Sequence, residues 1–310
     1  MLYDTHCHPY LAEKKSQDGI IKNFLHTWDF LNCIWTNIST SLTSIDIAKN
    51  NTSIFATIWI HPCDILRENN WRHTLLDLEK TLQKLEKIYL ENKQYIVWIW
   101  EIGLDYHWLE SMSQNFLKTQ IWESAYNKID KEKCPDIITR ISRNIKNYQE
   151  LFFKAQIKLA QKYNLPIIIH NRNSKDDVFR ILEELHFKNF IFHCYSENLE
   201  YAERLIEFAP NCKISFSGIV TFKSAKDIQD TAANIPLRNI IIETDSPFLT
   251  PTPLRWKEEN EPQFVQYVLN KIIELRSENS ELIQKTIFQN SVEIFTISSS
   301  QTLSKNEILS

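Results

Sequence analysis

Glycine is scarce in this chain of 310 residues, which has only three, although the usual share is about 7%. Tryptophan is plentiful instead, with nine residues. None of the six cysteines forms a C-x-x-C pair, so neither a disulfide framework nor a thiolate zinc site is indicated. No apolar run is long enough to cross a bilayer, and the N-terminus lacks a charged-then-apolar signal. We therefore expect a cytoplasmic protein with reduced thiols.

The charge balance is slightly acidic, with a formal net charge of −4 and an isoelectric point near 6.2. This balance excludes a protein that coats nucleic acid by electrostatics alone. It does not exclude a nuclease, because bound metal ions would add positive charge at the site. With 43% hydrophobic residues, the chain can bury a full core within one large domain.

Short apolar, β-branched segments alternate with amphipathic helical segments along the chain. This alternation predicts an α/β fold, a (β/α)₈ TIM barrel, whose covered parallel strands are apolar on both faces. A doubly wound sheet is a weaker alternative, since no glycine-rich loop follows the first strand. The predicted strands are 2–8, 32–38, 54–61, 95–102, 166–170, 190–194, 213–217 and 239–243, with helices including 77–90, 148–163 and 261–275.

The domain organisation follows from the same pattern. We expect one barrel domain over residues 1–297 and a frayed tail over 298–310. A polar segment rich in lysine and asparagine, about 109–145, interrupts the pattern after the fourth strand. It is predicted to be a partly helical insertion on the catalytic face, where loops usually determine substrate choice. A solvated helical hairpin and a nucleic-acid-binding surface are both compatible with its composition.

Candidate metal ligands lie at the ends of five predicted strands. His6 and His8 are two residues apart on the first strand, so their side chains point the same way and can converge on one ion. So many polar groups at one end of a barrel would be costly to bury without a ligand. Six ligands suit two ions sharing a carboxylate, and Zn²⁺, Mn²⁺, Mg²⁺ and Ni²⁺ all remain open. The other four candidates are Glu101, His170, His193 and Asp245.

Together with their neighbours, these residues resemble the TatD family of metal-dependent deoxyribonucleases, from Asp4 to about Pro262. The matching segments are 4–8, 60–62, 101–106, 166–172, 193–196, 215–223 and 243–247. The resemblance implies nuclease activity, with 3′→5′ trimming of single-stranded DNA typical, and no obligate protein partner is evident. The ligands it implies are His6, His8 and Asp245 for one ion, His170 and His193 for the other, and Glu101 bridging both.

Further roles follow from this reading. A hydroxide held between the ions would attack phosphorus in line, with Glu101 bridging and Asp245 orienting or deprotonating the nucleophile. Arg172, two residues beyond His170, is placed to bind a phosphate. His61 either contacts substrate or makes a structural hydrogen bond, two readings that are left open. The remaining two carboxylates of this set, Asp105 and Glu243, are expected to support the metal ligands rather than to bind metal.

The chain departs from the family where glycine is usual, at Glu197 and at three tryptophans, Trp59, Trp100 and Trp256. An indole at such places would clash or lose the backbone freedom of glycine. We hypothesise that the gene has the codon UGA at these three positions and that the organism reads UGA as glycine. A translation with a code in which UGA means tryptophan would then print Trp there. The alternative is genuine tryptophan in a degenerate paralogue.

Two other functions stay open beside the deoxyribonuclease. A similar metal shell could cleave an ester, as a deacylase of aminoacyl-tRNA would. A catalytically degenerate binding protein, its site blocked by Trp100, is the third possibility, and its metal content would distinguish it.

Overall fold

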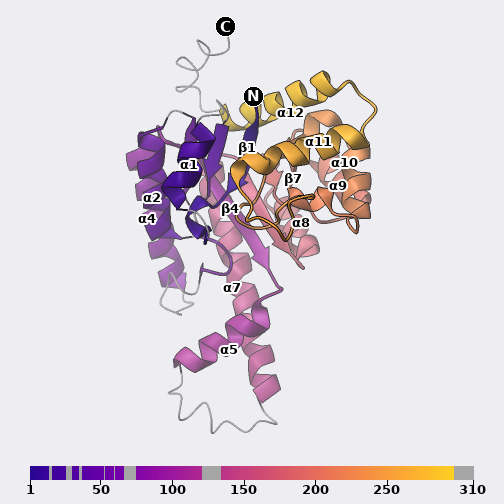
Figure 1. Ribbon diagram of the computed structural model, residues 1–310. Helices are drawn as coiled ribbons and strands as arrows, with labels where there is room; N and C mark the ends of the chain where they lie inside the picture. The colour runs from indigo at the N-terminus through magenta and orange to yellow at the C-terminus, as the bar shows by residue number, and fades with distance from the viewer. Residues whose placement is uncertain are drawn as a thin grey trace.

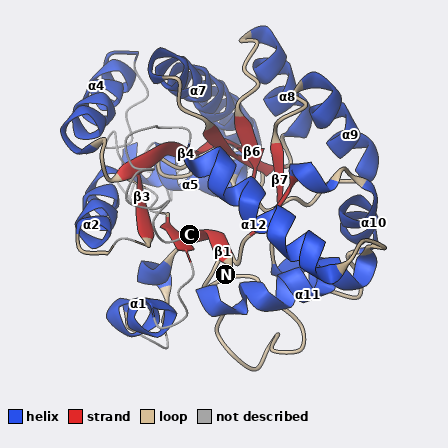
Figure 2. Cartoon of the chain, turned by 90° about the horizontal axis from the view of Figure 1, so that it is seen from above, coloured by secondary structure: helices blue, strands red, loops and turns tan. Residues whose placement is uncertain are grey.

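The computed structural model describes residues 1–13, 16–25, 30–34, 37–51, 53–58, 60–65, 75–120 and 134–296. Eight parallel strands lie side by side in the order of the sequence. The sheet closes on itself, because Asp245 donates its N–H to the carbonyl oxygen of His6 at 2.9 Å and His8 donates to that of Ser246 at 2.7 Å. Figure 2 shows the strands inside a ring of helices. The predicted TIM barrel is therefore confirmed.

The strands are short, as expected for a barrel of this kind. They are β1 Tyr3–Cys7, β2 Phe30–Cys33, β3 Ile54–Ile58, β4 Ile96–Asp105, β5 Ile167–Arg172, β6 Phe190–Phe192, β7 Lys213–Phe216 and β8 Ile240–Ile242. The described helices are α1 Gln17–Leu25, α2 Ile38–Lys49, α4 Leu75–Asn92, α5 Leu109–Gln120, α7 Cys134–Tyr163, α8 Lys175–Glu184, α9 Leu199–Phe208, α10 Lys226–Asn234, α11 Val265–Leu275 and α12 Ser280–Thr296.

The core lies between the strands and the helices that cover them. Strand β8 is three buried isoleucines, and the first three residues of β5 are also buried isoleucines. From the helix layer, Phe153 and Ile157 of α7 belong to the same apolar cluster. Burial of such side chains contributes roughly 1.5–3 kcal/mol each. We call this buried layer of strand and helix side chains the wall, and it is the main source of stability.

The second strand was predicted wrongly at its C-terminal end. Ile38, expected in a strand, is the first residue of α2. The Asn37 side chain accepts a hydrogen bond from the N–H of Thr40 at 3.0 Å, and Thr40 Oγ1 accepts one from the N–H of Asn37 at 3.1 Å. This reciprocal capping box satisfies backbone groups that a helix start leaves open, so it ends the extended segment.

Strands β4 and β5 run three and two residues further than predicted, ending at Asp105 and Arg172. Gly103 of β4 pairs with His170 of β5. A Cβ atom on Gly103, whose φ is +153°, would lie 2.0 Å from the carbonyl oxygen of His170. Only glycine allows this close approach, and it holds β4 against the strand that carries His170.

An arm projects from the barrel on the side where β4 ends (Figure 1). It consists of α5 and the first part of α7, residues 109–120 and 134–147. Helix α7 was expected to begin near Tyr148, but it begins at Cys134. Buried Met112 and Ile145, and the Oγ atoms of Ser113 and Ser142 at 2.7 Å, join the two helices of the arm. This contact lets a largely polar segment continue the helix.

Other predictions fall partly outside the described residues. These include residues 121–133 of the insertion, the tail, 298–310, and Trp59, together with the side chain of Trp100. Trp256 is described, with 88% of its surface exposed and a φ of +69°, a backbone region that favours glycine. Among the described residues, no helix has the length and hydropathy of a membrane span, and the five cysteines whose side chains are described are free thiols.

Candidate metal centre

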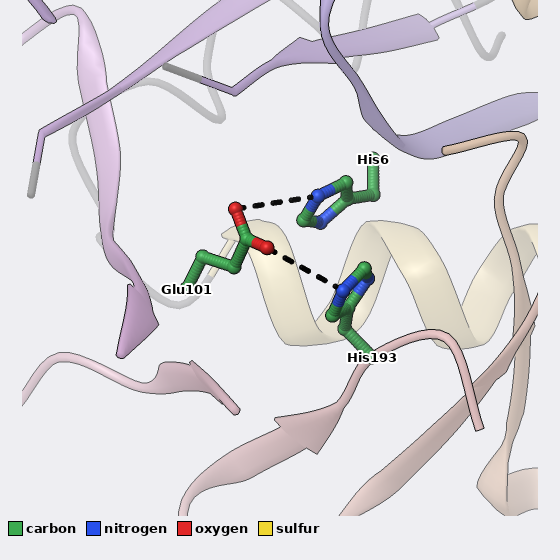
Figure 3. Close-up of side chains that lie close together, drawn as sticks. All are labelled: His6, Glu101 and His193. Carbon is green, nitrogen blue, oxygen red and sulfur yellow. Dashed lines mark ion pairs between the residues drawn. The ribbon is translucent and has the colours of Figure 1, made fainter. Parts of the chain in front are cut away.

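The six predicted ligands converge at the carboxyl ends of five strands. His6 lies in β1 and His8 directly follows it, Glu101 lies in β4 and His170 in β5, His193 directly follows β6, and Asp245 lies three residues beyond the end of β8. In Figure 3 the carboxylate of Glu101 points toward the rings of His6 and His193. The barrel thus gathers residues that are up to 239 positions apart in the sequence.

The first group of close ligand atoms comprises His6, His8 and Asp245. The Nε2 atoms of His6 and His8 are 3.2 Å apart. Asp245 Oδ1 lies 3.4 Å from His8 Nε2 and 3.7 Å from His6 Nε2. Two imidazole nitrogens and a carboxylate oxygen at this spacing form a donor set suited to a divalent ion.

Glu101 connects this group to the other histidines. Its Oε2 atom lies 3.7 Å from His6 Nε2, whereas its Oε1 atom lies 3.4 Å from His170 Nδ1 and 3.5 Å from His193 Nε2. The carboxylate therefore presents one oxygen to each side. His61 also approaches it, with Nε2 at 3.7 Å from Oε1.

The donor atoms themselves fit a cation. Glu101 Oε2 and His170 Nδ1 are buried and have no hydrogen-bond partner among the described residues. Buried polar atoms without partners are rare in folded proteins, and a metal ion would satisfy both. The close groups pair His193 with His6 and Glu101, and His170 with His61 and Glu101. The division of ligands between two ions that the family resemblance implies stays a prediction.

Outer contacts turn each imidazole toward the cluster. Asp105 Oδ2 lies 3.2 Å from His170 Nε2, and Glu243 Oε1 lies 3.0 Å from His193 Nδ1. These carboxylates occupy the ring nitrogens that face away from Glu101. Such carboxylate–histidine pairs fix ring orientation and raise the basicity of a metal ligand.

Burial and neighbouring charges shift the pKa values of Glu101 and His193. Burial would raise the pKa of Glu101, but the imidazole of His170, whose Nδ1 lies 3.4 Å from Oε1, and the charges of nearby histidines hold it well below its ordinary value. Burial opposes the charged form of His193, yet the carboxylate of Glu243 raises its pKa to about 9. A metal must displace the His193 proton, so its affinity should increase with pH.

The backbone around the ligands is strained. Glu101, Cys194 and Asp245 have φ values of +48°, +45° and +55°, in the left-handed region that residues other than glycine seldom adopt. Strain of this kind costs on the order of 1–3 kcal/mol per residue and clusters at functional sites. It indicates that the surrounding structure holds the ligand residues in place.

A cavity of about 660 Å³ opens above the cluster. Arg172 lines it, with Cζ 5.4 Å from the centre of the Trp108 ring. His61 lines it as well, and His61 Nδ1 accepts the N–H of Cys63 at 3.0 Å. Both sequence readings of His61, a structural hydrogen bond and a place facing the reaction, are thus compatible with its position.

Trp108 and Phe248, two aromatic residues of the cavity, were not among the site residues predicted from the sequence. Each stands three positions after an aspartate of the site, Asp105 or Asp245. An aromatic residue just beyond a ligand motif was the available signal.

Comparison with known proteins agrees with this geometry. A family model described as TatD related DNase matches residues 3–296. The metal-dependent hydrolase YabD of Bacillus subtilis is 31% identical over 301 residues, covering 96% of this chain and all of that protein. A metal-dependent hydrolase of Mycoplasma pneumoniae is 30% identical over 302 residues, covering 94% and 98%. The crystal structure of the Escherichia coli TatD homolog YJJV has a TM-score of 0.73 at 22% identity, covering 95% and 98%, which is a likeness of fold.

Proposed function

We propose, from the premise that this chain belongs to the TatD related DNase family, that it hydrolyses phosphodiester bonds of single-stranded DNA from the 3′ end. The chain is a TatD-type metal-dependent hydrolase, which gives the reaction class. The bond and the substrate are the parts that we add.

The residues that would hold two ions are His6, His8 and Asp245 for one, His170 and His193 for the other, and Glu101 for both. When bound, divalent ions such as Mg²⁺, Mn²⁺, Zn²⁺ or Ni²⁺ supply Lewis acidity at the phosphate and increase the acidity of water. Asp105 and Glu243 keep His170 and His193 oriented for this task.

Asp245 is the carboxylate that we assign to proton transfer. Its side chain is 14% exposed, compared with 5% for Glu101, and it lines the cavity. Its Oδ1 atom faces His6 and His8, and Oδ2 is the atom assigned to orient the attacking water and take its proton.

Two cationic or polar groups complete the substrate contacts. Arg172 would bind a phosphate oxygen with its planar guanidinium, which suits bidentate contacts. His61, whose pKa is lowered to about 3 by burial and by neighbouring His170, is neutral at ordinary pH. It would contact the leaving oxygen by hydrogen bonding without adding charge.

One observation carries the proposal: a buried carboxylate, Glu101, presents its two oxygens to separate histidine groups inside a cavity that also contains Arg172. Two divalent ions held there, with the Arg172 guanidinium beside them, would suit in-line displacement at phosphorus.

The test combines metal analysis with hydrolysis of end-labelled single-stranded DNA, double-stranded DNA, RNA and aminoacyl-tRNA. We expect metal-dependent shortening of single-stranded DNA from its 3′ end. The His61→Gln variant should keep its metal content and lose rate. Full metal content with deacylation of the tRNA, and no shortening of DNA, would contradict the proposal. A protein that purifies without metal and takes up none would indicate a degenerate binding paralogue.

A further inference from the structure

The cavity above the candidate metal centre has walls of two kinds. Imidazoles and carboxylates form its floor, whereas large apolar side chains line its rim. Two of the rim residues, Trp108 and Phe248, are aromatic, with exposed fractions of 45% and 51%. Exposed aromatic surface is unfavourable in water, and neither ring belongs to the described hydrophobic core clusters. Their place beside the site indicates a binding role. We call Trp108 and Phe248 the rim aromatics.

Backbone N–H groups of both rim aromatics bond to aspartates of the site. Trp108 donates its N–H to Asp105 Oδ1 at 3.4 Å, and Phe248 donates its N–H to the carbonyl oxygen of Asp245 at 3.0 Å. The ring centre of Phe248 is also 6.3 Å from that of His8. The two residues follow different strands, β4 and β8, and line the same cavity.

Arg172 adds a cation on the side of Trp108. Its guanidinium carbon lies 5.4 Å from the centre of the indole ring, within the range of a cation–π contact. A flat aromatic surface, a guanidinium and a metal-binding floor therefore line one cavity of about 660 Å³, a volume typical of small-molecule sites. A nucleotide has the matching parts, a flat base next to an anionic phosphate.

We propose that the rim aromatics bind the unpaired terminal base of the nucleic acid while its phosphate lies between Arg172 and the metal centre. The inference rests on the proposed function and names the residues that select its substrate. Every base has a π-face, so stacking on Trp108 and Phe248 tolerates any sequence. A base inside a duplex has both faces covered by its neighbours. The rim aromatics thus select for an unpaired end rather than for a base.

The ordinary backbone of Trp108 supports a genuine tryptophan at this position. Unlike Trp256, it is absent from the described residues with positive φ. Its carbonyl oxygen accepts the N–H of Met112 at 2.8 Å, which is the first turn of α5. Trp108 is therefore anchored where the arm begins, between β4 and α5.

The test changes both partners of the contact. Values of kcat/KM are measured for the metal-loaded full chain on single-stranded oligonucleotides, with a normal or an abasic terminal nucleotide at either end. For the unmodified protein, removal of the base from the end that is cleaved should lower kcat/KM roughly 5- to 100-fold, mainly through KM. Trp108→Ala and Phe248→Ala should lose a similar factor on the normal substrate and little more on the abasic one. Trp108→Phe, which keeps a ring, should recover most of the loss.

Leu282→Ala is the matched control, because Leu282 is 52% exposed on α12 and does not line the cavity. It should respond to the abasic substrate as the unmodified protein does, and circular dichroism should show that all variants fold. If base removal has the same effect in the alanine variants as in the unmodified protein, the role of the rim aromatics is overturned while the nuclease stands. If the unmodified protein shortens no single-stranded DNA, the proposed function fails, and this inference fails with it.

Discussion

The mouth of the barrel and the wall behind it differ in almost every physical respect. In the wall, β5 and β8 contribute runs of buried isoleucine, and Phe153 and Ile157 of helix α7 belong to the same apolar cluster. At the mouth, a few residues away, Glu101 is buried, strained at a φ of +48°, and left with an oxygen that has no hydrogen-bond partner among the described residues.

The stability of the fold thus comes from the wall, and the residues for chemistry lie at the mouth. Apolar burial in the wall stabilises the fold, whereas buried charge and positive φ at the mouth oppose it. A mouth of this kind persists because the wall supplies enough stability to hold it. Substitutions in the two regions should therefore have opposite signatures.

The largest effect is expected at the mouth, from Glu101→Gln. The amide cannot serve two ions as the proposed bridging carboxylate would, so hydrolysis should fall to background and metal content should drop. Added metal should raise the melting temperature of the unmodified protein, since a ligand that binds only the folded state stabilises it. The same addition should leave the variant's melting temperature unchanged. Retention of both ions by Glu101→Gln would show that Glu101 is not their common ligand.

In the wall, Phe153→Ala should destabilise the fold and spare the site. Phe153 is 1% exposed, and loss of a buried phenyl ring costs about 3–5 kcal/mol. Denaturant unfolding measures this loss, and the metal content per folded molecule should not change. The neighbouring Leu151→Ala, at a residue 47% exposed, is the control and should stay within about 0.5 kcal/mol of the original. A Phe153→Ala protein that folds stably but loses metal would end the separation of wall and mouth.

An intermediate effect, on metal affinity, is expected from Glu243→Gln, at a residue that contacts the metal ligand His193. Glu243 accepts hydrogen bonds from the Cys194 N–H and the Ser215 hydroxyl and orients His193. Loss of its charge should weaken metal binding by about 10- to 100-fold, measured by competition with a chelator. Glu203→Gln, on the exposed surface of α9, is the control. Unchanged affinity in Glu243→Gln would show that His193 needs no carboxylate to bind metal.

The smallest effect concerns Trp256, which has a positive φ without a buried environment to enforce it. Glycine avoids the steric cost of this backbone, about 1–2 kcal/mol. We expect Trp256→Gly to raise the free energy of unfolding by up to about 1 kcal/mol, measured with denaturant. Leu282→Gly in α12 should lower it by a similar amount, because glycine is unfavourable in a helix. The codons at 59, 100 and 256 decide the recoding hypothesis independently, and UGG at all three would exclude it.

Much of the fold was predictable because covered parallel strands are short and apolar on both faces, so they are recognisable in the sequence between the amphipathic helices. Their ends placed all six ligand candidates at one face before any coordinates were known, since residues at strand ends meet there. Local hydrogen bonding was harder to predict. The capping box of Asn37 and Thr40 ended a strand that hydrophobicity alone had extended to Ile38. Helix α7 also began earlier than its apolar pattern, because its partner in the arm is the equally polar α5.

The grouping of the ligands could not be predicted from the residues alone. The distance from His61 to Glu101 depends on the turn after β3, where the Cys63 N–H holds the imidazole. The rim aromatics were missed for a similar reason. Whether Trp108 and Phe248 face the cavity or the core depends on backbone turns after Asp105 and Asp245.

The number of residues in helix α7 determines how the arm is oriented relative to the barrel. It is continuous over 30 residues, from the arm to the layer covering β4, a length of about 45 Å. Inserting or deleting one residue near position 147 would rotate the arm by roughly 100° about the helix axis and shift it by about 1.5 Å. Each added or removed residue therefore changes the direction in which the arm points relative to the mouth. We call this dependence the helical phase. Changes of length that leave the helical residues of α7 untouched would leave that phase unaltered.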